Sequence, residues 1–391
     1  MKFLFFIFFT FTLNVLYSIE YASIKTGAER TELYFPELKG KTIAVVANQT
    51  SLIGETHLVD SLISSGINIK KIFCPEHGFR GTADAGAHVA NYTDSKTKIP
   101  VISLYGDKKK PSAEDLAGID IIVFDIQDVG VRFYTYISTL HYVMESCAEN
   151  KIQLMILDRP NPNGFYVDGP VLEVKHKSFV GMHPVPLVHG MTIAEYAQMI
   201  NNEGWLVNGE KCELKYILCD GYNHTNLYNL PVKPSPNLST MNSVFLYPSL
   251  GLFEGTVMSV GRGTDFPFQV VGHPTLKTEK FSFTPVAKKG ASMNPPFKGQ
   301  VCYGFDLRNI GEDYFYNRKV IDLQWLIKSY NKFGDKKKYF NSFLTKLAGT
   351  TELKTQIISG LTEDEIRKSW EPKLSQFKEI RKKYLLYEDF E

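Results

Sequence analysis

The feature that most constrains the fold is a regular alternation of apolar runs and helical segments between residues 41 and 219. The runs are near-continuous stretches of Val, Ile, Leu and Phe, as expected of parallel strands covered on both faces: 41–50, 69–74, 99–106, 119–127, 152–160 and 212–219. Segments with apolar residues at helical spacing lie between several of them: 56–66, which we expect to start at a Thr cap, 134–150 and 192–205. This order predicts right-handed crossovers and an open, mostly parallel α/β sheet.

The composition changes near residues 231–250, which are rich in Pro, Ser and Asn. Beyond this stretch the pattern is mixed, with predicted strands and helices at 267–274, 301–309, 321–333 and 362–387, the last interrupted by Pro372. A chain of 391 residues is long enough for two domains. We therefore predict a catalytic α/β domain over 24–248 and a smaller α+β domain over 249–391.

The first 18 residues have one Lys, then an apolar run, then small or polar residues, which is typical of a secretory signal. The run is short for a membrane span. We expect export to the periplasm or beyond the cell, and no stable membrane insertion after the signal is removed. The five Cys are odd in number and lack zinc spacing, so neither a disulfide framework nor a structural zinc is expected.

Other function classes lack their sequence signatures. The net charge is +2 and no basic block is present, which argues against nucleic acid as a partner. The chain has no G-x-G-x-x-G after its first strand, no Walker sequence, no H-E-x-x-H and no G-x-S-x-G. No cofactor is therefore expected. Four residues could form a metal site, although in no compact motif: His77, Asp84, His88 and Asp125.

Polar residues follow four of the predicted strands. In an open α/β sheet, ligands bind beyond the carboxyl ends of the strands. The polar residues at those ends are Asn48, Glu76, His77, Arg80, Asp125, Asp128, Arg132, Tyr134, Tyr136, Asp158, Arg159 and Asn161. We interpret this edge as a functional site because so many polar side chains gather there.

Structural roles for the same residues remain open. Asp125 could pair with Arg132 inside the core, and Asp158 could pair with Arg159 before the Pro-rich turn. Carboxyls, aromatic rings and cationic donors around a cleft suit glycoside hydrolysis, in which an acid protonates the leaving oxygen. Glu76 is the leading acid candidate, with His77 beside it, and the charges of Asp125 and Asp128 would help it to keep its proton.

Several longer motifs occur in one order along the chain: PEHGFRG, FDIQDVGVRFYTYISTL, LDRPNPNG, GPVLE, VPLVHGMTIAEYA, SPNLST, YPSLGLFEGT and VGRGTDFPFQVVG. Together they resemble the exo-β-N-acetylmuramidase family typified by NamZ. The resemblance implies a Rossmann-like N-terminal domain, a smaller C-terminal domain, and a cleft between them. It also implies release of N-acetylmuramic acid from the non-reducing ends of peptidoglycan fragments, with Glu76 at the family's PEHG position. The stretch 81–100 departs from the family pattern in carrying fewer acidic residues.

The implied substrate suggests further binding residues. Muramic acid carries a lactyl carboxylate, for which a guanidinium is the matching donor: Arg80, Arg132, Arg159 or Arg262. Asn48, Asn161 and His189 could bind hydroxyl or acetamido groups, and Phe266 or Phe268 could present a ring to the sugar. The alternatives are a metal-dependent cell-wall hydrolase or amidase, and a non-catalytic muropeptide-binding protein.

Overall fold

A computed structural model describes residues 23–81 and 90–391. Its main sheet has seven strands in the order β5-β6-β4-β1-β7-β8-β9. Their bounds are β1 (Thr42–Ala47), β4 (Asn68–Cys74), β5 (Tyr92–Thr93), β6 (Pro100–Ser103), β7 (Ile121–Asp125), β8 (Gln153–Leu157) and β9 (Leu214–Ile217). All pairs are parallel except β5 with β6. The parallel strands follow the doubly wound order of a Rossmann sheet, which confirms the predicted fold class.

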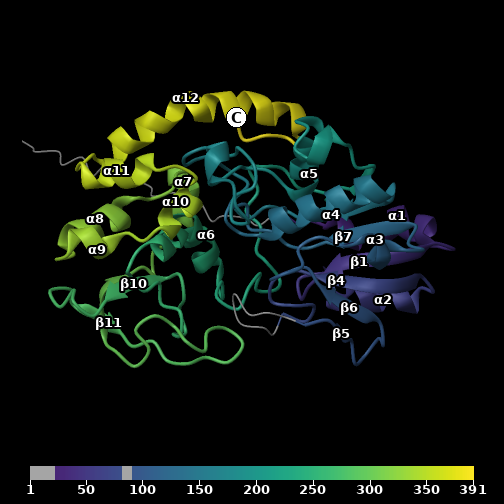
Figure 1. The fold of residues 1–391 in the computed structure, drawn as a ribbon, viewed down its shortest axis with the longest axis horizontal. Helices are drawn as coiled ribbons and strands as arrows, with labels where there is room; N and C mark the ends of the chain where they lie inside the picture. Colours follow the sequence, from purple (N-terminus) through teal and green to yellow (C-terminus); the bar gives the residue numbers. More distant parts are fainter. Residues whose placement is uncertain (1–22, 82–89) are drawn as a thin grey trace, which may run out of the picture.

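Both faces of this sheet are covered, because its strands alternate apolar residues between two cores. Ile43 and Val45 of β1 pack with α1 (Thr31–Leu38) and α2 (Leu58–Ser64). Ala44 and Val46 belong to the second core, together with residues of α3 (Ala113–Leu116), α4 (Tyr136–Asn150) and α5 (Ile193–Asn202). Figure 1 shows this layered arrangement around β1, β4 and β7.

The residues before α2 correct the predicted helix start. Thr56 and His57 form strand β3 (Thr56–His57), which pairs with β2 (Leu52–Ile53) in a small antiparallel hairpin. The N-cap is His57, whose Nδ1 accepts a hydrogen bond from the Val59 amide at 3.2 Å. The Thr cap was therefore a wrong prediction, because hairpin pairing uses Thr56 as a strand residue.

The C-terminal part forms a smaller α+β unit, as predicted. A three-stranded antiparallel sheet has the order β10-β12-β11, with β10 (Val270–His273), β11 (Phe281–Phe283) and β12 (Cys302–Asp306). The helices around it are α6 (Met241–Leu250), α7 (Glu312–Arg318), α8 (Gln324–Lys332), α9 (Lys336–Tyr339), α10 (Phe343–Ala348), α11 (Glu352–Ile358) and α12 (Glu363–Arg381). The predicted domain boundary at 248/249 falls inside α6. Short 3₁₀ turns occur at Gly27–Glu29, Val174–His176, Val207–Gly209, Gly251–Gly255 and Lys382–Tyr384.

Helix α12 connects the two parts of the molecule. It arches over the top of the view from α11 towards α5 (Figure 1). The predicted interruption at Pro372 is wrong, because the helix runs through this residue from Glu363 to Arg381. Trp370 and Phe377 anchor it in the main core, so tertiary packing offsets the backbone hydrogen bond that a proline removes.

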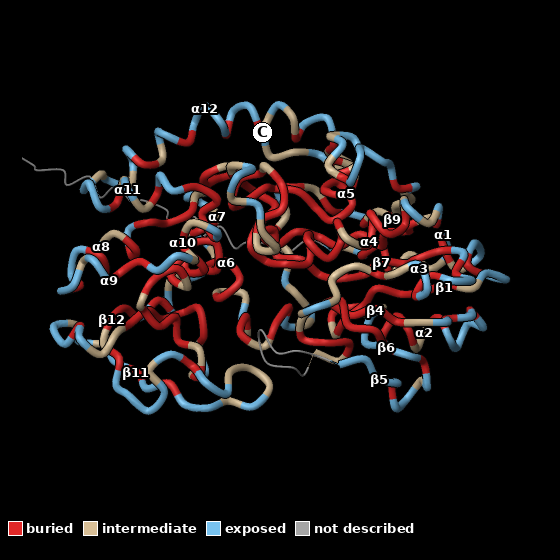
Figure 2. The backbone as a smooth tube through the Cα atoms, viewed as in Figure 1, coloured by how far each residue is buried: buried red, intermediate tan, exposed pale blue. Residues whose placement is uncertain are grey.

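The burial pattern places the core along the sheet and behind α6, with exposed residues on the outer helices and loops (Figure 2). All five cysteines are free and buried. Across the described ranges, no helix has the length and apolar character needed to cross a bilayer. The predicted signal at 1–18 lies outside the described residues.

Candidate active site

A cavity lies where loops from the carboxyl edge of the main sheet meet the C-terminal unit. It consists of a small hollow of about 60 Å³ and a larger one of about 420 Å³. Residues that line both are Glu76, Phe133, Thr135, Tyr247 and Arg262. The first of these follows β4, the next two follow β7, and the last two come from the C-terminal part of the chain. The cleft is therefore built by both parts of the molecule.

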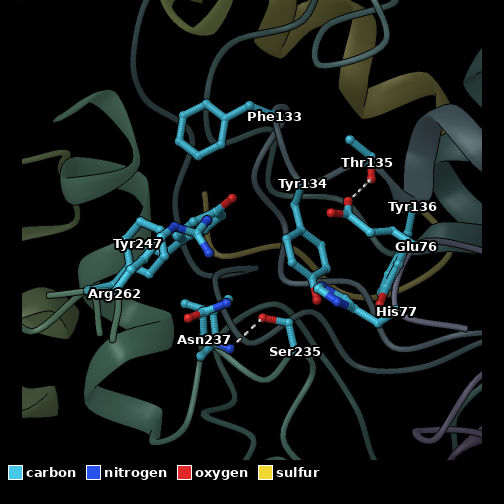
Figure 3. A pocket seen from close by; sticks show the side chains of 12 residues that line it. Glu76, His77, Phe133, Tyr134, Thr135, Tyr136, Ser235, Asn237, Tyr247 and Arg262 are labelled. Atoms are coloured by element: carbon cyan, nitrogen blue, oxygen red, sulfur yellow. Dashed lines mark hydrogen bonds between the residues drawn. The ribbon is translucent and has the colours of Figure 1, made fainter. Parts of the chain in front are cut away.

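Glu76 enters the cleft from the turn after β4. The backbone of His77 and Gly78 has φ of 71° and 75°, a left-handed conformation that turns the chain sharply after the strand. Thr135 donates its hydroxyl to Oε2 of Glu76 at 3.4 Å (Figure 3). Burial raises the pKa of Tyr105 to about 12, and the charge of Glu76 and a hydrogen bond between the two side chains add to this effect. Two hydroxyls thus hold the Glu76 carboxyl.

Arg262 faces the same cavity from the opposite side in Figure 3. Its Nε and Nη2 donate to Oε1 of Glu254 at 3.0 and 2.8 Å, and its guanidinium carbon lies 5.0 Å from the centre of the Phe268 ring. Burial lowers the pKa of Arg262, but the Glu254 carboxylate outweighs it, so the net direction is upward. The cleft therefore holds a permanent cation across from Glu76.

Tyr134 and Tyr136 form an aromatic wall of the small hollow. Their rings meet edge to face with centroids 4.7 Å apart. Both hydroxyls donate to the Pro234 carbonyl, at 2.8 and 3.3 Å. Asn48 lies behind this wall, where its Nδ2 donates to the Tyr136 hydroxyl at 3.0 Å. Asn48 therefore positions a lining residue and does not itself line the cavity.

Asp125 and Arg159 form a buried ion pair below the cleft. Arg159 donates Nε and Nη2 to the two carboxylate oxygens of Asp125 at 2.5 and 3.0 Å. Burial raises the pKa of Asp125, although Arg159 opposes the shift. Neither side chain lines the cavity. The pairings left open from the sequence, Asp125 with Arg132 and Asp158 with Arg159, are both wrong.

Asp128 is also buried and is absent from the cavity lining. Its Oδ1 accepts the Gly130 amide at 2.7 Å, while its Oδ2 has no hydrogen-bond partner within the described ranges. Burial raises the pKa of Asp128 to about 7. Burial raises the pKa of Tyr134 and of Tyr247, and the charge of Asp128 adds to both shifts. Asp128 therefore lies close behind these lining residues.

Two predicted arginines have other partners. Arg80 forms an ion pair with Asp94 at 3.0 Å and covers the ring of Phe79. Arg132 is fully buried, and its guanidinium donates to the carbonyls of Pro170, Val185 and Leu347. Neither lines the cavity, because each guanidinium is held by groups elsewhere in the structure. Arg262 is thus the only predicted cation that the described structure brings to the cleft.

Three further predicted residues stabilise loops and the chain terminus. Asp158 accepts the Ala194 amide and the Tyr387 hydroxyl at 3.0 and 2.7 Å, and burial raises its pKa to about 6. Asn161 is held inside the turn that follows β8, where its Nδ2 donates to the Met191 carbonyl. His189 accepts the Met191 amide, and burial lowers its pKa to about 3. The structure does not bring these residues to the cavity.

The remaining predictions concern aromatic rings and a metal site. Phe268 lines the small hollow, whereas Phe266 packs on the C-terminal sheet under Arg308. Within 23–81 and 90–391, no group of three or more His, Cys, Asp or Glu side chains could hold a metal ion. Asp84 and His88 lie outside the described residues. Of the less acidic stretch at 81–100, residues 82–89 also lie outside them.

Sequence reasoning missed several lining residues: Tyr105, Ser235, Asn237, Tyr247 and Glu254. Tyr105 lies at the end of the predicted strand at 99–106, so the rule of polar strand ends could have found it. The others lie within the SPNLST and YPSLGLFEGT motifs, outside any strand end. Their place in the cleft depends on packing between the two parts of the chain.

The fold and the cleft define a two-domain α/β enzyme with a carboxyl at the rim of a Rossmann-like sheet. Residues 43–242 match the N-terminal domain of the exo-beta-N-acetylmuramidase NamZ family, and residues 245–387 match its C-terminal domain. The chain therefore belongs to this family and is a glycoside hydrolase.

Relatives extend the match over nearly the whole chain. The peptidoglycan beta-N-acetylmuramidase NamZ of Bacillus subtilis is 41% identical over 372 residues, which is 90% of this chain and 89% of the relative. A crystal structure of a DUF1343 family protein from Bacteroides fragilis is 44% identical, has a TM-score of 0.87, and covers 94% of this chain and 99% of its own. A second DUF1343 family structure from the same organism is 27% identical with a TM-score of 0.76, covering 93% of this chain and 99% of its own.

Proposed function

We propose that this protein releases N-acetylmuramic acid from the non-reducing ends of peptidoglycan fragments, with Glu76 as the general acid and base. The observation that carries the proposal is that Glu76 and Arg262 line one cavity from different parts of the chain. The activity printed for the Bacillus subtilis relative supports the substrate class.

Glu76 suits the proton-transfer steps. It is half-buried, at the carboxyl end of the sheet, and within hydrogen-bond reach of two hydroxyls. In the first step its carboxyl proton moves to the glycosidic oxygen as the bond to the anomeric carbon breaks. Water then bonds to the anomeric carbon and gives one proton to the ionised carboxylate, so the sugar leaves with a hydroxyl at that carbon and Glu76 regains its proton. The hydroxyls of Tyr105 and Thr135 keep the carboxyl in one orientation through both steps.

Arg262 suits recognition of muramic acid. This sugar differs from N-acetylglucosamine by its lactyl carboxylate, which a guanidinium binds more strongly than it binds a neutral hydroxyl. The bond to Glu254 fixes Nε and Nη2, which orients the rest of the guanidinium over the cavity. Selectivity for muramides follows from a cation that is present whether or not substrate is bound.

We also propose that the protein works outside the cytoplasm, where peptidoglycan lies. The N-terminal pattern of residues 1–18 supports this location. Fusing residues 1–30 to a reporter that is active only after export tests it. A reporter that stays inactive in the cytoplasm would contradict the proposal.

The test of the activity compares two chromogenic substrates. The β-N-acetylmuramide should release its chromophore, and the β-N-acetylglucosaminide should react far more slowly because it lacks the carboxylate. Glu76→Gln should lower kcat by a factor of about 10² or more with an unchanged melting temperature. Full activity of this variant would remove Glu76 from the proposed role.

Two further outcomes separate the alternatives. Activity that is lost with a chelator and restored by zinc or manganese would favour a metal-dependent wall hydrolase. Saturable binding of muropeptides without product at any enzyme concentration would favour a binding protein.

A further inference from the structure

The small hollow beside Glu76 is too small for a sugar ring. Its volume is about 60 Å³, and one water needs about 10–15 Å³ by the same kind of measure. It therefore has room for about four or five non-hydrogen atoms. A pyranose ring with its substituents must lie in the adjoining hollow of about 420 Å³ and can extend only one substituent into the smaller one.

Part of the small hollow is apolar. The rings of Phe133, Tyr134, Tyr136 and Phe268 line it together with Leu238. The hydroxyls of both wall tyrosines already donate to the Pro234 carbonyl. The surfaces left for contact are the four aromatic rings and the Leu238 side chain. They suit a substituent that ends in an apolar group such as a methyl.

Two polar groups among the lining residues have no partner within the described part of the chain. Asn237 is 3% exposed, and its Nδ2 donates to the Ala291 carbonyl at 3.0 Å, which orients the amide. Its Oδ1 makes no hydrogen bond to a described residue and is left as an acceptor. Tyr247 also lines the hollow, and its hydroxyl makes no hydrogen bond to any described residue. Besides Glu76, Thr135 and Arg262, which line both hollows, the small hollow thus presents an acceptor and a donor that a ligand can satisfy.

We propose that this hollow is the subsite for the 2-acetamido group of the sugar. The amide N–H donates to Oδ1 of Asn237, the amide oxygen accepts from the Tyr247 hydroxyl, and the methyl contacts the rings. Arg262 lines both hollows, but the lactyl carboxylate is the poorer occupant of the small one, because it would meet the Asn237 oxygen and the Glu76 carboxyl as further acceptors there. It remains in the larger hollow, which Arg262 also lines. This inference rests on the proposed function and names which part of the sugar the small hollow selects.

The first test varies the acyl group. Chromogenic β-muramides would carry N-acetyl, N-propionyl, N-butanoyl or a free amine. Each added methylene should lower kcat/KM by a factor of about 10 or more, and the free amine should lose at least as much, because it leaves both partners unsatisfied. Equal rates for the acetyl and butanoyl substrates would overturn the subsite. Muramides with a lengthened lactyl group and an unchanged N-acetyl group control for the alternative occupant. A loss with each methylene added to the lactyl group, together with equal rates across the acyl series, would assign the hollow to the lactyl group and overturn the proposal.

The second test changes the hollow itself. Leu238→Val removes one methylene from the wall, so the ratio of kcat/KM for N-propionyl over N-acetyl should rise several-fold. An unchanged or lower ratio in a folded variant contradicts the proposal. Tyr247→Phe should weaken competitive inhibition by N-acetylmuramic acid about tenfold and leave inhibition by muramic acid unchanged. The matched control is Tyr216→Phe in β9, which lies away from the cavity lining and should change neither constant.

A direct binding measurement keeps this test separate from the proposed function. Calorimetry with the free sugars should show N-acetylmuramic acid binding more tightly than N-butanoylmuramic acid by a factor of about 10 or more. This difference is expected even if Glu76 proves not to be the acid. Equal binding of the two sugars would refute the subsite, while turnover of the muramide would still support the proposed activity.

Discussion

The hydroxyl of Tyr387 donates a hydrogen bond to Oδ2 of Asp158 at 2.7 Å, and this contact ties the end of the chain to the carboxyl end of β8. The two residues are 229 positions apart. Next to this contact, the Leu386 amide donates to Glu195 at 2.9 Å. The segment after α12 therefore closes back onto the N-terminal domain through buried carboxylates.

Tyr387→Phe is expected to destabilise the protein more at about pH 8 than at about pH 5. Burial raises the pKa of Asp158 to about 6, and the Tyr387 bond is one of the groups that oppose the rise. Above that pKa the variant leaves an ionised, buried carboxylate without one of its donors, which costs about 1–3 kcal/mol. Below it the carboxyl is neutral and the loss is smaller. Urea unfolding at the two pH values measures this, with Tyr216→Phe as the control; equal losses at both would contradict the assignment.

Asp128→Asn tests the buried carboxyl behind the cleft. A carboxyl whose pKa is about 7 in the folded protein, raised from 3.8, holds a proton that the unfolded chain has lost. The stability of the native protein should therefore fall as pH rises from about 4 to about 7, by up to about 1.4 kcal/mol for each unit of the shift. The asparagine variant should show a flatter profile over this range. The control is Asp220→Asn at the exposed Asp220, which should keep the native slope; a slope in Asp128→Asn as steep as in the native protein would argue against the shift.

Arg262→Lys tests the bidentate geometry of the cation. A lysine keeps the charge but loses the planar fork that Glu254 orients. We expect KM for the N-acetylmuramide to rise by a factor of about 10, with a smaller change in kcat. The slow reaction of the N-acetylglucosaminide should not change, because this substrate has no carboxylate. An equal loss on both substrates would show that Arg262 acts on something other than the lactyl group.

Tyr105→Phe tests how the Glu76 carboxyl is held. The Tyr105 hydroxyl hydrogen-bonds Glu76 and so helps to orient its carboxyl. Without it, kcat for the N-acetylmuramide should fall about tenfold or less with little change in KM, because the proton donor is less precisely placed. An unchanged melting temperature distinguishes this effect from a general loss of packing, and an unchanged kcat would contradict the role of Tyr105. Tyr142→Phe, at a ring outside the cavity lining, is the control.

The strand pattern was enough to predict the sheet, because its strands are local runs with apolar residues on both faces. The helix starting at Thr56 and the break at Pro372 were mispredicted for a common reason. Thr56 pairs in a hairpin, and Pro372 lies in a helix held by Trp370 and Phe377. In both cases a tertiary contact decided against the local preference.

For the residues at the carboxyl edge of the sheet, the sequence predicted the edge but not the direction of each side chain. Position after a strand predicts which edge of the sheet a residue occupies, and Glu76, His77, Tyr134 and Tyr136 do line the cavity there. It does not predict where a side chain points. Asp125 and Arg159 satisfy each other below the cleft, because a buried charge is stable only with a partner.

By itself, the sequence determined an α/β sheet with a polar carboxyl edge, a second domain and a resemblance to one family of hydrolases. Only the tertiary structure decided which polar groups face the cavity. Arg262, Tyr247 and Asn237 meet Glu76 across the cleft although they lie more than 150 residues further along the chain. Such contacts depend on how two packed units fit together, and that fit arises from the summed burial of many side chains, which no short motif records.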